Sequence, residues 1–376
     1  MKQRLARVWD ASAGRHLLLA LLGLVVVVLV VESVSDFRNV QLASLAYLGI
    51  AAGGLTVLTG LNGQISLGHG ALMAIGAYTA ALMLQDGEPP LPLLGIVVVS
   101  VLVALAVGTL VGVAAARLHG PYLAGATLAL AVAVPGIALR FGETLGGEAG
   151  LRVRLPDIPE WVLDAMYFVT GSELTRSSYV AYLAWLVLIV TYVLLANLSR
   201  SRVGRRWRAV RDDEVAAELA GIGLGRSRVS AFMVSAAAAG AAGAVMAFAV
   251  RLAAPSGFTL TLSLTLLAAV VLGGLGSLTG ALLGAALLTF LPDVVADAGR
   301  SAGLSDIRAA ELAPLVYGLV MIAVVLLAPA GLVGTVRSLQ TRRTRRGPAA
   351  GDAARRTTHT DATPPGAVPT SKGDVR

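Results

Sequence analysis

Polar side chains interrupt one apolar stretch of the chain at a place where glycines also gather. Between Gly60 and Gly70, glycines alternate with amide, hydroxyl and imidazole groups. Unwound backbone at such a break inside a membrane can offer N–H and C=O groups to a polar solute. This chemistry suits a solute path, although His69 taken alone is more typical of a hydrogen-bonded structural histidine. The candidate path residues are Asn62, Gln64, Ser66, Gly68 and His69.

A second glycine-rich break lies in the other half of the chain, and it adds Gly273, Gly274 and Gly276 to the candidate path. Paired breaks in corresponding places of two halves indicate a transport path. The competing interpretation is close helix packing, because Gly276, Gly280 and Gly284 recur every four residues. Packing is favoured for this second break. The path is favoured for the first, where four polar groups exceed what packing requires.

A basic loop predicted over residues 199–229 holds a short amphipathic segment. Asp212 or Asp213 can cap a helix there, and Gly221 suits the left-handed position that ends one. The exposed stripe formed by Val215, Ala216 and Leu219 cannot be buried by the loop itself, so the groove of a partner protein is the expected receptor. The alternative is an ordinary surface helix on a positively charged loop, whose Lys and Arg residues only keep the loop in the cytoplasm.

The composition excludes several kinds of chemistry. The chain of 376 residues is 56% hydrophobic and 14% charged, has no cysteine, and carries a net charge of +8. Apart from His69, the apolar segments contain no Asp, Glu, Lys, Arg or His, whereas proton relays and intramembrane hydrolases need paired or metal-bound groups of these types. We expect no catalytic residues, no metal site and no cofactor. Sodium coupling through carbonyl groups stays open. A GxxxxGK[ST] nucleotide loop is absent, so ATP-driven transport would need another chain.

The apolar residues form blocks long enough to cross a bilayer, since about 20 helical residues span about 30 Å. These blocks predict an all-α, polytopic transmembrane helical bundle with Gly-broken helices and a cytoplasmic helix. Ten membrane segments result, or nine if residues 259–292 form a re-entrant hairpin. The blocks are Leu17–Val31, Val40–Thr59, Leu61–Leu84, Leu91–Ala116, Gly120–Leu139, Tyr179–Leu198, Ser230–Val250, Thr259–Pro292 and Leu312–Ala328.

Lys and Arg near the ends of the blocks predict the orientation, because positive loops stay in the cytoplasm. Residues 1–16 and 199–229 are then cytoplasmic, residues 17–336 form the transmembrane domain, and residues 337–376 form a basic, disordered cytoplasmic tail. The acid-rich segments 141–178 and 293–311 are external. Asp157–Arg176 is either a helix at the headgroup level or an ordinary loop. A weak cleavage pattern at Ser33–Ser35 leaves open whether the first block is removed.

Several motifs, in one order along residues 40–335, are similar to those of the membrane permeases of ABC importers for branched-chain amino acids. The longest is Gly204-Arg-Arg-Trp-Arg-Ala-Val-Arg-Asp-Asp-Glu-Val-Ala-Ala-Glu-Leu-Ala-Gly-Ile222, which resembles their coupling loop. The others are Gly63–Gly70, Gly76-Ala-Tyr78, Gly120-Pro-Tyr122, Thr127-Leu-Ala129, Gly273–Gly276 and Pro329-Ala-Gly-Leu-Val-Gly334.

The resemblance implies a non-enzymatic permease subunit in the cytoplasmic membrane. Its implied partners are a second, related permease, two ATP-binding-cassette ATPase subunits and an external solute-binding protein. Val203–Gly225 would dock into the ATPases. Glu214 stands one place earlier than in the general importer signature, which leaves its docking role open. The implied coupling residues are Arg208, Arg211, Glu214, Val215, Ala216, Ala217, Leu219 and Gly221.

Two further hypotheses compete with the importer. A passive channel for a small neutral solute such as urea would explain the uncharged spans without a partner, but it leaves the capped loop helix unexplained. A membrane enzyme or scaffold lacks the required side chains. The solute itself, a branched-chain amino acid or a related small molecule, is not determined by the residues.

Overall fold

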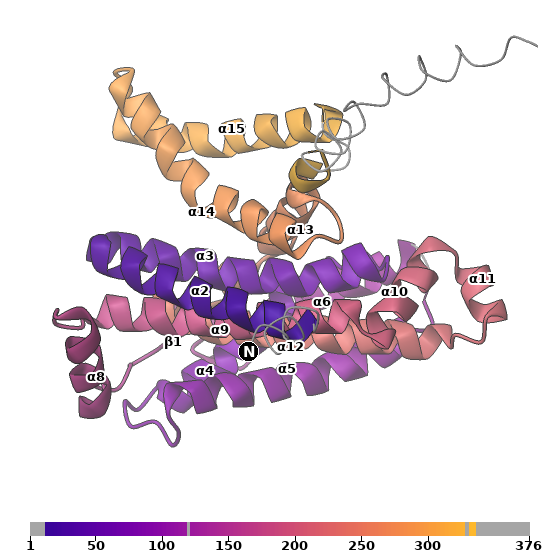
Figure 1. Ribbon diagram of the computed structural model, residues 1–376, viewed down its shortest axis with the longest axis horizontal. Coiled ribbons are helices and arrows are strands. Elements are labelled where there is room, and N and C mark those ends of the chain that lie inside the picture. The colour runs from indigo at the N-terminus through magenta and orange to yellow at the C-terminus, as the bar shows by residue number, and fades with distance from the viewer. Residues whose placement is uncertain (1–11, 119–120, 328–330, 336–376) are drawn as a thin grey trace, which may run out of the picture. The chain divides into compact units, whose positions relative to one another are not determined.

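The computed structural model describes residues 12–118, 121–327 and 331–335, and it is built almost entirely of helices (Figure 1). The chain divides into a large unit, Met1–Val333, and a second unit, Gly334–Arg376. The predicted tail at 337–376 lies outside the described residues. The same holds for residues 1–11 of the predicted N-terminal segment, and for Gly120 and Pro329 of the motifs above.

The helices named below belong to the large unit, and short strands and turns connect them. In chain order they are α2 (Ser12–Ser33), α3 (Asp36–Leu55), the π-helix η1 (Thr56–Leu61), α4 (His69–Leu84), α5 (Leu93–Ala115), α6 (Pro121–Arg140), α7 (Gly142–Leu145), α8 (Glu160–Thr170), α9 (Arg176–Arg200), α10 (Arg202–Asp212), α11 (Glu214–Leu219), α12 (Leu224–Val250), α13 (Leu260–Gly273), α14 (Leu278–Ser301) and α15 (Asp306–Leu327). The short 3₁₀ turns are η2 (Gly147–Ala149) and η3 (Pro255–Phe258).

Helix α12 lies at the centre of the packing, against α3, α4, α5 and α9 (Figure 1). Its buried residues are mostly alanine and glycine. A Cβ atom added at Gly243 would lie 1.9 Å from the Met73 carbonyl oxygen of α4, and one at Gly240 would lie 2.4 Å from Ala104 Cβ of α5. Lipid provides little hydrophobic driving force between helices, so close approach of small residues is what supports their association.

Within the described residues, seven helical segments are long and apolar enough to cross a membrane. Two shorter apolar helices, Leu21–Ser33 and His69–Leu84, accompany them. The all-α, polytopic character predicted above is therefore confirmed, whereas the predicted count of nine or ten segments stays a prediction. The seven segments are Asp36–Leu61, Leu93–Ala115, Tyr122–Arg140, Arg176–Arg200, Leu224–Val250, Pro255–Gly273 and Leu278–Ser301.

Several predicted boundaries differ from those of the structure. The block Leu61–Leu84 is not one helix, because residues 62–68 leave the helical conformation and only His69–Leu84 is α-helical. Helix α14 runs on to Ser301, through Pro292, so residues 293–301 of the predicted external segment 293–311 are helical. Helix α12 already begins at Leu224, which shortens the predicted 199–229 loop. Hydropathy locates apolar residues, but polar residues can extend a helix beyond them.

The predicted external segment 141–178 contains, besides α7 and η2, a short strand and a longer helix. Strand β1 (Leu151–Arg152) pairs antiparallel with β2 (Leu252–Ala253), and β2 directly follows the C-terminal end of α12. Helix α8 makes Glu160–Thr170 of the predicted Asp157–Arg176 region helical, and none of its residues is buried. Trp161 and Phe168 on this helix are 73% and 91% exposed. Placement of α8 at a membrane surface stays a prediction.

Candidate functional site

The first glycine break begins where α3 ends in the π-helical turn η1. The wider turn closes with a hydrogen bond from the Asn62 N–H to the Val57 carbonyl oxygen, at 3.2 Å. Gly63 then adopts a φ of +79°, a conformation that glycine reaches without strain. The chain becomes helical again at His69. The interruption predicted from the sequence is therefore confirmed.

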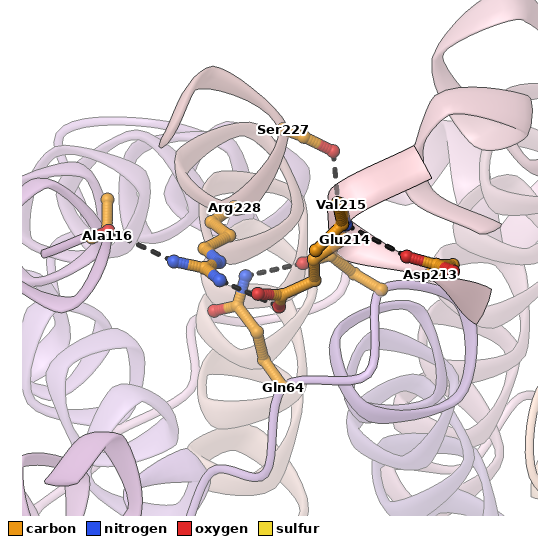
Figure 2. Close-up of polar contacts among 8 residues, drawn as sticks. Gln64, Ala116, Asp213, Glu214, Val215, Ser227 and Arg228 are labelled. Carbon is orange, nitrogen blue, oxygen red and sulfur yellow. Dashed lines mark hydrogen bonds and ion pairs between the residues drawn. The ribbon is translucent and has the colours of Figure 1, made fainter. Parts of the chain in front are cut away.

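The amide side chains of this break are buried and used within the protein. Asn62 donates through Nδ2 to Ser227 Oγ of α12 at 3.3 Å, and it accepts a hydrogen bond from Gln64 Nε2. Thr59 Oγ1 donates to the Gln64 carbonyl oxygen at 3.0 Å. In this conformation the amide side chains form hydrogen bonds within the break and to α12, as Figure 2 shows around Gln64 and Ser227. A role in contacting solute stays a prediction.

The second part of the first glycine break is hydrogen-bonded to other helices. His69 is fully buried and bonds through Nε2 to the Ala51 carbonyl oxygen of α3 at 2.9 Å. The backbone N–H of Leu67 donates to Thr127 Oγ1 of α6 at 3.0 Å. A Cβ added at Gly68 would lie 2.7 Å from the Thr127 carbonyl oxygen. These contacts favour a structural role for His69 and leave Gly68 no room for a side chain.

Ser66 is also fully buried, and its Oγ accepts a hydrogen bond from the Gly68 N–H at 3.3 Å. The next glycine, Gly70, donates its N–H to Ser263 Oγ of α13 at 2.9 Å. Backbone donors near the start of α4, which have no intrahelical partner, are thus satisfied by hydroxyl groups. This side of the first break contacts the helix that leads into the second break.

The second break separates α13 from α14 at Gly274–Ser277. Gly274 and Gly276 have φ values of +115° and +80°. Helix α14 packs closely on α13, since a Cβ at Gly284 would lie 2.0 Å from the Ala269 carbonyl oxygen. Gly280 and Gly284 make the close helix contacts of the packing interpretation, whereas Gly276 lies outside both helices. Gly276 lies in the connection because Ser277 caps α14 by accepting the Gly280 N–H at 3.2 Å.

The two breaks touch each other. A Cβ added at Gly60 would lie 2.3 Å from the Gly276 backbone nitrogen and 2.7 Å from its Cα. Only two residues without side chains can approach so closely. The structure therefore brings Gly276 of the second break to the start of the first, whereas Gly273 is in contact with Gly280 of α14.

The basic loop contains a helix that the sequence interpretation missed. Ser201 caps α10 by accepting the Val203 N–H at 3.1 Å, and Trp207 and Val210 are buried against the spans. Trp207 Nε1 donates to Ser230 Oγ of α12 at 2.9 Å. The spacing of Val203, Trp207 and Val210, by four and then three residues, is the signal that could have predicted this helix. Arg208 is half-buried on α10.

The short helix α11 follows, with the ends that the sequence predicts. Asp213 Oδ1 accepts the N–H groups of Val215 and Ala216 at 2.9 and 3.0 Å. Gly221 takes a φ of +79°, and the Ile222 N–H bonds back to the Ala217 carbonyl oxygen at 3.0 Å.

The faces of α11 divide as follows. Ala217 is buried towards the rest of the chain, whereas Val215 and Leu219 are 69% and 86% exposed. Ala216 is exposed as well. An apolar pair one turn apart therefore faces outward from a helix with fixed ends.

Glu214 is occupied by an ion pair inside the chain (Figure 2). Its Oε1 lies 2.7 Å from Arg228 Nη2, and the Arg228 side chain is only 6% exposed. Arg228 also donates through Nη1 to the Ala116 carbonyl oxygen at the end of α5, at 3.4 Å. Arg228 and Ser227 are functional candidates that sequence reasoning missed, since nothing local distinguishes them from other residues of a positive loop. The pair anchors α11 to α5 and α12.

Replacing Glu214 by alanine is expected to lower the free energy of unfolding by about 1.5–3 kcal/mol, because a buried guanidinium loses its carboxylate partner. Glu218→Ala is the matched control, since Glu218 is an exposed carboxylate on the same helix. Thermal unfolding of the two purified variants measures the difference. Equal melting temperatures would mean that the Glu214–Arg228 pair does not anchor α11.

Within the described part of the chain, no group of three or more His, Asp or Glu residues could hold a metal ion. The chain brings together two glycine breaks, which lie among helices of membrane-spanning length, and a short helix with an exposed apolar face. Arg211 of α10 reaches this junction, donating through Nη1 to the Gly60 carbonyl oxygen at 2.7 Å. These features are those expected of a membrane transport permease.

The chain belongs to the family described as branched-chain amino acid transport system / permease component, which matches residues 40–325. This confirms the resemblance seen in the motifs. The high-affinity branched-chain amino acid transport system permease protein LivM of Escherichia coli strain K12 is 33% identical over 80% of this chain and 71% of its own length. LivM of Salmonella typhimurium is 32% identical with the same coverage.

Relatives of lower identity are also permease proteins of high-affinity branched-chain amino acid transport systems. The permease protein BraD of Pseudomonas aeruginosa is 27% identical over 75% of this chain and 89% of its own length. The permease protein LivH of Escherichia coli strain K12 is 29% identical over 79% and 94%. No solved structure matches the chain. The chain is therefore similar both to LivM and to LivH, two permeases found in one organism.

Proposed function

We propose that the chain is the permease subunit of an ATP-driven importer that carries branched-chain amino acids, or a related small solute, across the cytoplasmic membrane. It works with a second, related permease, two ATP-binding-cassette ATPase subunits and an external solute-binding protein. Family membership and the branched-chain amino acid transport role for which the LivM relatives are named support the substrate class. In this proposal both termini and the α10–α11 loop are cytoplasmic.

The main observation that supports coupling to the ATPases is that α11 has one exposed apolar side and one anchored side. A capped helix of six residues exposes Val215 and Leu219, while Ala217 and the Glu214–Arg228 pair fasten its other side to the spans. A helix with an outward apolar face suits the groove of a partner protein. Because it is anchored, movement of a partner that holds this face is transmitted to the spans.

The solute path is proposed to lie near the two glycine breaks, whose candidate residues remain those predicted from the sequence. Backbone dipoles at helix ends complement the ammonium and carboxylate groups of an amino acid. The buried hydrogen bonds of Asn62 and Gln64 describe one conformation. Alternating access requires some of these contacts to exchange when the path opens.

Reconstitution tests the proposal. The chain, its paired permease and the ATPases are placed in proteoliposomes with the binding protein, and uptake of radiolabelled leucine, isoleucine and valine is measured with and without ATP. We expect concentrative uptake that needs ATP and every partner, because the chain has no nucleotide loop of its own. Downhill equilibration of urea by the chain alone, with no ATP-dependent uptake, would instead support the passive channel.

A further inference from the structure

Arg211 joins the loop helices to the point where the glycine breaks touch. Its Nη1 donates to the Gly60 carbonyl oxygen at 2.7 Å, and its side chain is 36% exposed. An added Cβ at Gly276 would lie 3.6 Å from the same nitrogen, and one at Gly63 would lie 3.0 Å from Arg211 Cγ. One arginine side chain thus packs beside three glycines drawn from both breaks, with its stem at Gly63 and its guanidinium at Gly60 and Gly276.

The Gly60 carbonyl oxygen is a suitable hydrogen-bond acceptor for the Arg211 guanidinium. It lies at the C-terminal end of η1, where helix carbonyls lack intrahelical donors and the helix dipole favours a positive charge. Gly60 itself is pressed against the Gly276 backbone. A displacement of the guanidinium therefore acts at once on the end of the first helical segment and on the turn of the second break.

The other edge of the Arg211 side chain is held by the loop. Nε and Nη2 donate to Asp212 Oδ1 at 2.9 and 2.7 Å, and the next residue, Asp213, caps α11. Such an exposed ion pair contributes little to stability. Its effect is geometric, because a forked contact fixes the orientation of the guanidinium plane. Only two residues separate Arg211 from α11.

We infer that Arg211 is a positioning residue that couples movement of α11 to the two glycine breaks, by holding the Gly60 carbonyl where Gly60 meets Gly276. This inference rests on the proposed function, in which α11 receives the movement of the ATPases. Glu214 and Arg228 anchor α11 to the helix bundle, whereas Arg211 carries the movement to the place where the path is interrupted.

The test uses the complete reconstituted transporter with Arg211→Ala. We expect the ATPases to co-purify in normal amount and ATP hydrolysis to continue, while uptake falls by about tenfold or more, within the usual range of coupling between sites. The ratio of ATP hydrolysed to solute imported therefore rises. Arg211→Lys restores part of the uptake, because an ammonium can still bond to the Gly60 carbonyl but cannot make the forked contact with Asp212.

Arg202→Ala is the control, because Arg202 is an exposed arginine at the start of the same helix. It should leave uptake, hydrolysis and their ratio unchanged. An unchanged ratio in Arg211→Ala overturns the inference, and so does a parallel loss of hydrolysis and uptake, which indicates a merely structural role. If the wild-type complex itself shows no ATP-dependent uptake, the proposed function fails instead.

A second measurement does not depend on uptake. The chain has no cysteine, so Leu275→Cys, at an exposed position of the second break, introduces a single site for a spin label. We expect ATP binding to change the mobility of this label in the otherwise wild-type and Arg202→Ala complexes, but not in Arg211→Ala. A nucleotide-dependent change that persists in Arg211→Ala overturns the inference. The inference is also overturned if the change is missing in the complexes that keep Arg211.

Discussion

Replacing Val215 and Leu219 together by aspartate is expected to release the ATPase subunits from the membrane complex and to abolish ATP-dependent uptake. Each aliphatic side chain contributes about 1.5 kcal/mol or more when a partner buries it. Loss of both therefore weakens docking by about 3 kcal/mol, or roughly a hundredfold in the dissociation constant. Co-purification of the ATPases with the tagged permease measures the release.

The double variant should still fold, because both positions are exposed and neither side chain packs inside the chain. An aspartate at position 215 is even favourable in the first turn of α11. Val169→Asp is the matched control, since Val169 is 67% exposed on the separate helix α8. Retention of the ATPases by the double variant would contradict the docking role of α11, and their loss in the control would show that the effect is unspecific.

Replacing Gly243 by valine should prevent the chain from accumulating in the membrane. An added Cβ would already lie 1.9 Å from the Met73 carbonyl oxygen and 2.8 Å from the Ala77 nitrogen, and both are backbone atoms of α4. The backbones of α4 and α12 must therefore separate. Overpacking a core typically costs 1–3 kcal/mol, so about 3 kcal/mol or more is expected here even for alanine. Membrane abundance and thermal unfolding in detergent measure the effect.

Gly225→Ala provides the comparison for this prediction. Gly225 belongs to the same helix, but an added Cβ there meets nothing within 4 Å. Alanine at this place should be neutral or stabilise the helix by up to about 1 kcal/mol. Equal stability of Gly243→Ala and Gly225→Ala would mean that α4 and α12 do not cross at Gly243.

The predictions that succeeded concern features encoded within a few neighbouring residues. Long apolar blocks predicted a polytopic helical protein, and glycine clusters predicted both interruptions, at residues 62–68 and 274–277. Asp212 or Asp213, together with Gly221, predicted the two ends of α11, and the structure has Asp213 as the cap. Caps, turns and periodicity depend on local backbone chemistry, which is why one sequence suffices to locate them. The family likewise follows from motifs in a fixed order.

The amino-acid sequence was therefore enough to predict the membrane class, the permease family, both glycine breaks and an apolar stripe on α11. The contact of Gly60 with Gly276, the reach of Arg211 to their junction and the ion pair of Arg228 with Glu214 became visible only in the folded chain. The first two contacts join parts of the chain that are far apart in sequence, and their partners are glycines and a backbone carbonyl that carry no recognisable pattern. Glu214 and Arg228 are nearer in sequence, but nothing local distinguishes them from the other charged residues of this loop. Where such groups meet depends on how the helices pack, because small residues allow close approach without specifying which neighbour approaches.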